Sequence, residues 1–179
     1  MRTSAVMACV AGVCVCAATH LVVATARPNE PRGLPRGLSG QLSKQRPDAR
    51  VVTLEDLSKR HRYLFRKDHG GGCPGLVRAN FYGNGKPTWA LSLIEGENRN
   101  QKAELVVARQ TGQSWEILSL EKADGTPVVW REGPGKYVDV CGAKTIRAMN
   151  PVNVFVGYES WGIVYAWTGK AVEKVQISD

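Results

Sequence analysis

From residue 76 onward, turn-forming residues divide the sequence into short runs of β-branched and aromatic residues. Segments such as Gly83-Asn84-Gly85-Lys86-Pro87 and Thr168-Gly169-Lys170 separate the runs. Strands of this length and spacing are typical of antiparallel sheets. The sequence therefore predicts a mainly β fold, with antiparallel sheets arranged like a propeller blade or a sandwich. The expected strands are 76–81, 89–95, 104–109, 115–120, 128–130, 152–158, 163–167 and 172–177.

One N-terminal amphipathic helix is predicted before the strands, over about residues 53–67. Thr53 and Asp56 form a capping-box pattern at its start, and Gly70-Gly71-Gly72 ends it. The apolar face of this helix consists of Leu54, Leu57, His61, Leu64 and Phe65. We expect that face to pack on the sheet. The alternative for so basic a helix is a calmodulin-binding or membrane-surface segment.

The first 26 residues have the organisation of a secretory signal peptide. A basic start, Met1-Arg2, precedes an apolar stretch over residues 5–23, and Ala24-Thr25-Ala26 is a small-x-small cleavage pattern. We therefore expect residues 1–26 to be removed and the protein to be secreted or periplasmic. An uncleaved membrane anchor is the alternative, because the apolar stretch approaches the roughly 20 residues that span a bilayer.

Most of the positive charge lies near the N-terminal end of the expected mature chain. The whole sequence has a net charge of +8, and the segment 27–68 carries +6 of it. Residues 27–50 are rich in Pro, Gly and Arg without apolar periodicity, which predicts a flexible basic arm before a single domain over 51–179. The arm is either a linker or an attachment to an acidic surface. Nucleic acid is not an expected partner in an exported protein.

Two of the five cysteines, Cys73 and Cys141, lie beyond the predicted signal peptide. In an exported chain, such a pair predicts one disulfide; in a reducing compartment it would be two thiols. Neither cysteine belongs to a Cys-x-x-Cys pair or to a Cys/His cluster with metal-ligand spacing. We therefore expect no metal and no cofactor.

The stretch from residue 79 to residue 90 resembles the FG-GAP/VCBS repeat. That repeat implies a loop between two strands of a β-propeller-type blade, which often binds calcium through acidic side chains. Four positions match the repeat: Gly83, Gly85, Lys86 and Pro87. The acidic ligands of the family fall on Asn80, Tyr82, Asn84 and Thr88, none of which is a carboxylate. Because ligand charge sets much of calcium affinity, we expect the loop geometry without the metal.

More broadly, residues 73–179 look like small secreted bacterial proteins, whose domains mostly serve adhesion or binding. On that analogy and on the lack of a catalytic motif, we expect an exported, non-enzymatic binding domain for a protein or a cell-envelope polymer. Aromatic side chains at turns are the candidate contacts. These are Tyr82 at the tip of the FG-GAP-like loop and Trp161 at a hairpin turn.

Two other functions stay open at this point. The first is a small hydrolase that uses His61 or His69 as a base together with Glu95 or Glu97. The second is an inhibitor or immunity-type partner of an exported enzyme. Enzymatic turnover distinguishes the hydrolase from the binding domain, and co-purification identifies an inhibited enzyme.

Overall fold

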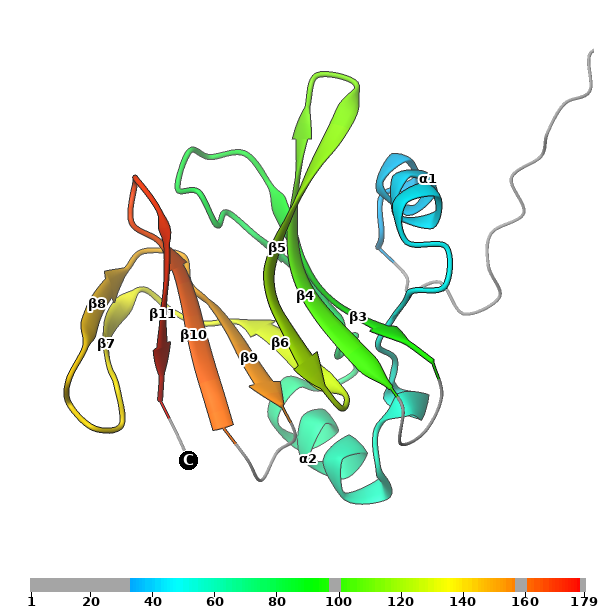
Figure 1. The fold of residues 1–179 in the computed structure, drawn as a ribbon. Coiled ribbons are helices and arrows are strands. Elements are labelled where there is room, and N and C mark those ends of the chain that lie inside the picture. Colours follow the sequence, from blue (N-terminus) through cyan, green and yellow to red (C-terminus); the bar gives the residue numbers. More distant parts are fainter. Residues whose placement is uncertain (1–32, 97–100, 157–160, 178–179) are drawn as a thin grey trace, which may run out of the picture.

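The computed structural model describes residues 33–96, 101–156 and 161–177 (Figure 1). Within them the predicted mainly β fold is confirmed, with 45% strand in antiparallel sheets and two short helices. Two sheets face each other across a shared apolar core, which is the sandwich arrangement. The predicted signal peptide, residues 1–26, lies outside the described residues.

The first sheet contains five strands: β1 (Arg50–Val51), β2 (Leu76–Ala79), β3 (Thr88–Glu95), β4 (Lys102–Thr111) and β5 (Ser114–Asp124). Their order is β1-β3-β4-β5, and β2 also pairs with β3. Because β1 is opposite Leu93 and Ile94 while β2 is opposite residues 88–91, β1 and β2 lie end to end along the same edge of β3. Strand β5 forms the other edge of the sheet.

The second sheet contains β6 (Pro127–Arg131), β9 (Val152–Val156), β10 (Trp161–Trp167) and β11 (Val172–Gln176), in the order β11-β10-β9-β6. A separate hairpin of β7 (Gly135–Val138) and β8 (Thr145–Ala148) packs Ile146 and Ala148 against Val164 and Ala166 of β10. The molecule therefore has a small third layer on the outer side of the second sheet.

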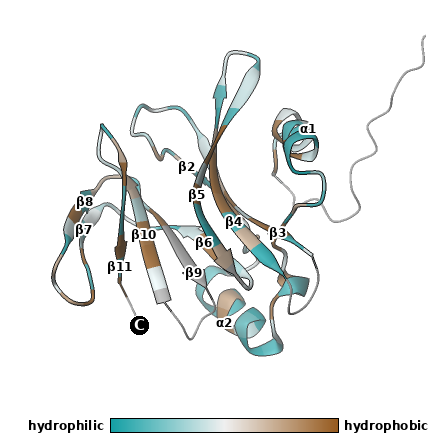
Figure 2. Cartoon of the chain, in the orientation of Figure 1, coloured by the Kyte–Doolittle hydropathy of each residue, from teal (hydrophilic) through white to brown (hydrophobic). Residues whose placement is uncertain are grey.

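The core between the two sheets follows from the alternation of side chains along the strands. On β4, Leu105 and Val107 join the core shared with Val129, Ile163 and Tyr165 of the second sheet. The intervening Val106 and Ala108 belong to a different apolar cluster on the outer side of the first sheet. Both faces of β4 are thus covered, in agreement with the apolar colouring of this strand in Figure 2.

Helix α1 (Arg36–Gln45) corrects the prediction of a flexible arm over residues 27–50. Leu38 and Leu42 are 0% and 7% exposed, and they pack with Trp115 on the outer side of the first sheet. Spaced four residues apart, they form one short apolar stripe on the helix. That stripe was too short to stand out within a segment rich in Pro and Gly. Residues 27–32 lie outside the described residues.

An ion pair fixes the C-terminal end of α1 to the first sheet. The guanidinium group of Arg46 donates to both carboxylate oxygens of Glu104 on β4, at 2.6 and 3.0 Å. Both side chains are less than one-fifth exposed. Hydrogen bonding from Arg46 lowers the pKa of Glu104 although burial opposes the shift. The geometry is bidentate, the strongest form of such a pair.

We expect Glu104→Gln to lower the free energy of unfolding by about 1 kcal/mol at pH 7. The folded protein lowers the pKa of Glu104. The stabilisation that the Glu104 carboxylate gives to the folded state is therefore present above its unfolded pKa, about 4.3, and is lost as pH falls through its folded pKa. Urea unfolding of both proteins between pH 7 and pH 2.5 measures the difference. A difference that stays constant over this range would contradict the prediction.

The predicted helix over residues 53–67 is present as two pieces. Leu54–Asp56 form a 3-10 turn, in which the Asp56 carboxylate accepts hydrogen bonds from the Thr53 N–H and hydroxyl at 2.8 and 2.9 Å. Helix α2 (Lys59–His69) then begins after Ser58, whose hydroxyl accepts from the His61 N–H at 3.1 Å. None of the helices in the described segments is long and apolar enough to cross a membrane.

Ser92 joins the two short edge strands to each other and to the second sheet. Its carbonyl accepts from the Val52 N–H at 3.0 Å, and its own N–H donates to the Gly75 carbonyl at 2.9 Å. The Ser92 hydroxyl is fully buried and donates to the carbonyl of Pro127 at 2.7 Å. Gly75 consequently lies directly against the backbone of Val52.

The predicted disulfide between Cys73 and Cys141 is wrong, because both cysteines are free thiols in the structure. Cys73 packs half-buried on the outer side of the first sheet, with its sulfur 3.5 Å from the Val52 carbonyl oxygen. Cys141 is exposed in the turn between β7 and β8, a hairpin that covers the second sheet. The two residues therefore belong to different layers. Burial raises the pKa of the Cys73 thiol.

Candidate functional site

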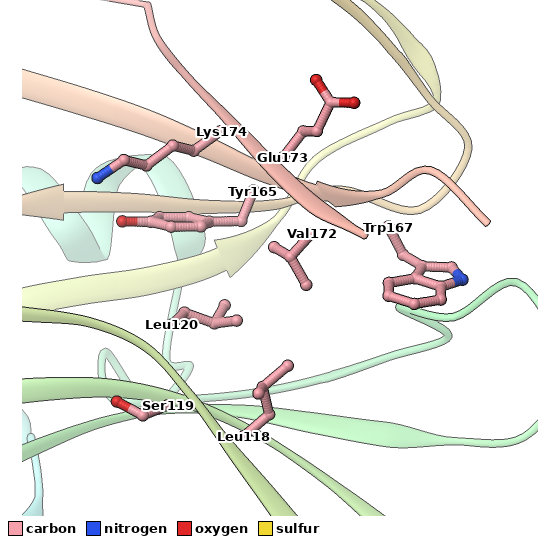
Figure 3. A pocket seen from close by; sticks show the side chains of 8 residues that line it. All are labelled: Leu118, Ser119, Leu120, Tyr165, Trp167, Val172, Glu173 and Lys174. Carbon is pink, nitrogen blue, oxygen red and sulfur yellow. The ribbon is translucent and has the colours of Figure 1, made fainter. Parts of the chain in front are cut away.

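A groove of about 470 Å³ opens along the flank of the sandwich, between β5 of one sheet and β10–β11 of the other (Figure 3). We call it the edge groove, because β5 and β11 are edge strands of their sheets. Its lining is mainly apolar in the middle and charged at the rim. The lining residues are Leu118, Ser119, Leu120, Tyr165, Trp167, Val172, Glu173 and Lys174.

A β-bulge in β5 supplies one wall of the edge groove. Leu105 is paired with Glu121 and Val106 with Ser119, so Leu120 is the extra residue of β5. Ahead of the bulge, Trp115 and Ile117 belong to the apolar cluster under α1, and Leu118 points to the other side. Leu118 is 37% exposed, so part of its side chain is open to the groove. Alternation along β5 thus directs Leu118 toward the second sheet, and the bulge keeps Leu120 and Glu121 on that same side.

One end of the edge groove is polar. The hydroxyl of Tyr165 donates to Oε2 of Glu121 at 2.7 Å, and Nζ of Lys174 forms an ion pair with the same oxygen. Burial raises the pKa of Glu121, but hydrogen bonds from Lys174 and Tyr165 outweigh burial, so the net shift is downward. Burial and the bond to Glu121 raise the pKa of Tyr165.

These shifts define what the polar end does at neutral pH. Glu121 is ionised and already accepts two hydrogen bonds, and Tyr165 is neutral. A general base or acid works best when its pKa lies near the operating pH, and neither group meets that condition. The arrangement is suited to holding the two sheet edges together and to orienting a ligand.

The other end of the edge groove is aromatic. The ring of Trp167 lies edge-on to that of Tyr82, with the ring centroids 5.3 Å apart. The guanidinium carbon of Arg109 lies 4.5 Å from the centroid of the Tyr82 ring, and Arg109 is also paired with Glu116 at 2.7 Å. The sequence-predicted contact residue Tyr82 is therefore at the end of the groove, half-buried, and burial raises its pKa.

The edge of β5 presents unpaired backbone groups beside the groove. The side-chain amide of Gln41 on α1 bonds both the N–H and the C=O of Trp115, so these groups point away from β4. Because backbone groups alternate along an antiparallel strand, those of Ile117 and Ser119 point the same way. No strand pairs with this edge in the described part of the chain.

The FG-GAP-like loop uses its polar side chains to hold its own backbone. Gly83 and Gly85 have φ values of 67° and 78°, which favour glycine. Asn84 Oδ1 accepts from the Lys86 N–H at 3.0 Å, and the buried Thr88 hydroxyl accepts from the Phe81 N–H at 3.0 Å. Two of the positions that carry calcium ligands in the family thus serve the turn. Among the described residues no group of three or more His, Cys, Asp and Glu side chains forms a metal cluster.

The remaining sequence candidates are not brought into the groove by any described contact. Trp161 is the first residue of β10, opposite Val156, and its side chain lies outside the described residues. The ring of His69 packs against Phe65 and Trp130, at centroid distances of 5.0 and 4.5 Å. Glu97 lies outside the described residues, so the predicted histidine–glutamate hydrolase site remains untested.

The fold and the groove define the chain as a two-sheet β domain with a ligand-sized groove between its sheet edges. Comparison with protein-family models, with curated proteins and with solved structures gave no match. The resemblance to the FG-GAP/VCBS repeat therefore remains a prediction that rests on the loop residues alone.

Proposed function

We propose that this protein is an exported, non-enzymatic binding domain that holds an extended segment of a partner protein in the edge groove. The observation that carries the proposal is the combination of an apolar groove with a free strand edge. An added strand gains affinity from main-chain hydrogen bonds, here to Ile117 and Ser119, and specificity from alternate side chains that enter a pocket. Leu118, Leu120 and Val172 supply that pocket.

A protein segment fits this site better than a cell-envelope polysaccharide. A sugar ring binds by stacking on a free aromatic face, whereas the Tyr82 ring already has Arg109 over one face and Trp167 at its edge. A peptide in contrast supplies backbone groups that pair with the free edge of β5 and apolar side chains that fill the groove. An inhibited exported enzyme would be one such protein partner.

The test uses a display library of random 12-residue peptides, followed by direct titration of the selected sequences. We expect selected peptides to alternate apolar and polar residues and to slow hydrogen exchange at the Ile117 and Ser119 amides. Leu118→Glu buries a charge under the peptide and should weaken binding at least about tenfold. The matched control is Val138→Glu on β7, a residue of similar exposure away from the groove.

Three results would overturn the proposal. One is a library that yields no binder. Another is a set of binders that Leu118→Glu and Val138→Glu weaken equally. The third is competition between soluble envelope polysaccharide fragments and the selected peptides, which would identify the polymer as the ligand of the groove. Turnover of generic ester, peptide or glycan substrates that His69→Ala abolishes would instead support the hydrolase.

A further inference from the structure

The outward face of α2 carries an unusual concentration of positive charge. The eleven residues Lys59–His69 contain five Lys and Arg against the single carboxylate of Asp68, a net charge of +4. That is half of the net charge of the whole chain. We call the exposed stripe of this helix the α2 cationic face. It consists of Lys59, Arg60, Tyr63, Arg66 and Lys67.

Part of the positive charge elsewhere on the described surface is held in ion pairs. Arg46, Arg50, Arg109, Lys144 and Lys174 each form an ion pair with a carboxylate. Within the described segments no such pair involves Lys59, Arg66 or Lys67. These cations therefore keep their charge available to an anionic partner.

Tyr63 lies at the centre of the α2 cationic face and is 66% exposed. Lys59, Arg60, Arg66 and Lys67 flank it at positions −4, −3, +3 and +4, so all five residues share one helical stripe. Tyrosine has an apolar ring and a polar hydroxyl, and it is enriched where water meets a membrane.

The opposite face of α2 is fixed in the core. Phe65 is 2% exposed and packs with Val52, Leu57, Ile94 and Val128, while the Arg62 guanidinium donates to the carbonyls of Glu55 and Leu57. The helix therefore presents its cationic face without turning its apolar face outward. Any surface it binds is contacted from outside rather than penetrated by the helix.

We propose that the α2 cationic face binds the surface of an anionic phospholipid bilayer. The face is a convex ridge of long, flexible side chains, and a fluid bilayer adapts to such a ridge without a complementary shape. A folded acidic protein would need a concave surface that fits this ridge. Each Lys or Arg near an anionic membrane contributes about a fivefold gain in binding. Helix α2 covers one end of the sandwich in Figure 1, so the edge groove on the flank remains accessible.

The experiment is co-sedimentation of the full chain with vesicles of phosphatidylcholine alone or with 30 mol% phosphatidylglycerol. Binding to the anionic vesicles should exceed binding to neutral ones and should fall steeply between 50 and 300 mM salt. Arg66→Glu/Lys67→Glu should reduce the anionic partition coefficient at least about tenfold. The control Lys86→Glu/Lys170→Glu makes the same charge change in two exposed loops outside α2 and should reduce it less than threefold.

The apolar stretch over residues 5–23 is common to all variants, so the comparison between the two double variants isolates the helix. Circular dichroism and thermal melting establish that both are folded. Equal losses in both double variants would overturn the proposal, because net charge alone would then explain binding. Equal binding of the wild-type chain to neutral and anionic vesicles would also overturn it. So would charge-dependent retention on polyaspartate without retention on anionic vesicles, which would assign the face to an acidic polypeptide.

Discussion

Replacement of Gly75 by alanine is expected to lower the free energy of unfolding by about 3 kcal/mol or more, and the melting temperature by roughly 10 °C. A Cβ atom at this position would lie 2.5 Å from the carbonyl oxygen, 2.6 Å from the nitrogen and 2.8 Å from the Cβ of Val52. Two of these three atoms are backbone, so no change of rotamer relieves the clash. The edge strands β1 and β2 would have to separate.

That separation has a further cost at Ser92. The Ser92 backbone bonds Val52 on one side and Gly75 on the other, so movement of either edge strand breaks a buried hydrogen bond. The matched control is Gly71→Ala, which lies two residues after the end of α2 and has no atom within 4 Å of its added Cβ. Thermal melting and urea unfolding of both variants provide the measurement. Equal stability of Gly75→Ala and Gly71→Ala would contradict the end-to-end arrangement of β1 and β2.

Phe65→Ala is the second large expected effect, a loss of about 3–5 kcal/mol in the free energy of unfolding. Phe65 is the anchor of α2 and is among the largest fully buried side chains in the described residues. Its ring packs with apolar residues of β3, β4 and β6, and it contacts the ring of His69. Its removal leaves a cavity beneath the helix and weakens the cover at that end of the sandwich.

Tyr63→Ala on the same helix is the matched control. Tyr63 is 66% exposed, so its replacement should change the free energy of unfolding by about 0.5 kcal/mol or less. The comparison separates helix propensity from burial, because both variants introduce the same residue one half-turn apart. If the two variants were equally stable, α2 would not be docked through Phe65.

The β architecture was predictable because its signal is local. Each expected run from residue 76 onward contains or overlaps a strand, since β-branched and aromatic residues between Gly and Pro turns leave few other conformations. The strands that were not predicted have few β-branched and aromatic residues. Strand β1 has only two residues, and β7 begins at Gly135, directly after Gly133 and Pro134, which are turn-forming residues. Their pairing depends on tertiary contacts.

Helix α1 was not predicted from the sequence, for a related reason. Its sequence contains two glycines and begins after Pro35, so local propensity favours a flexible segment. Its position depends on Leu38, Leu42 and Gln41, which contact residue 115, far along the chain. The disulfide prediction failed because it assumed a long-range contact that the fold does not make. It rested on a count of cysteines, whereas pairing requires that Cys73 and Cys141 lie in the same layer.

The candidate site was only partly predictable. Tyr82 was identified from its place at a turn, and it does lie at the aromatic end of the edge groove. The groove itself depends on the extra residue Leu120 in β5 and on the meeting of two sheet edges that are far apart in sequence. No periodicity along one strand indicates such a meeting. The run of Lys and Arg in α2 was visible, but its exposure required knowledge of which face Phe65 fixes in the core.

The distance in sequence between α1 and its docking site has a consequence for synthesis. Gln41 bonds a residue 74 positions later, so the helix emerges from the ribosome long before β5 exists. At roughly 5–20 residues per second, Leu38 and Leu42 stay without their docking surface for about 4–15 s. Throughout that interval the nascent chain offers an apolar stripe to chaperones or to an export machinery. Helix α1 is thus made before every strand of the first sheet and reaches its place on that sheet only after β5 has been made.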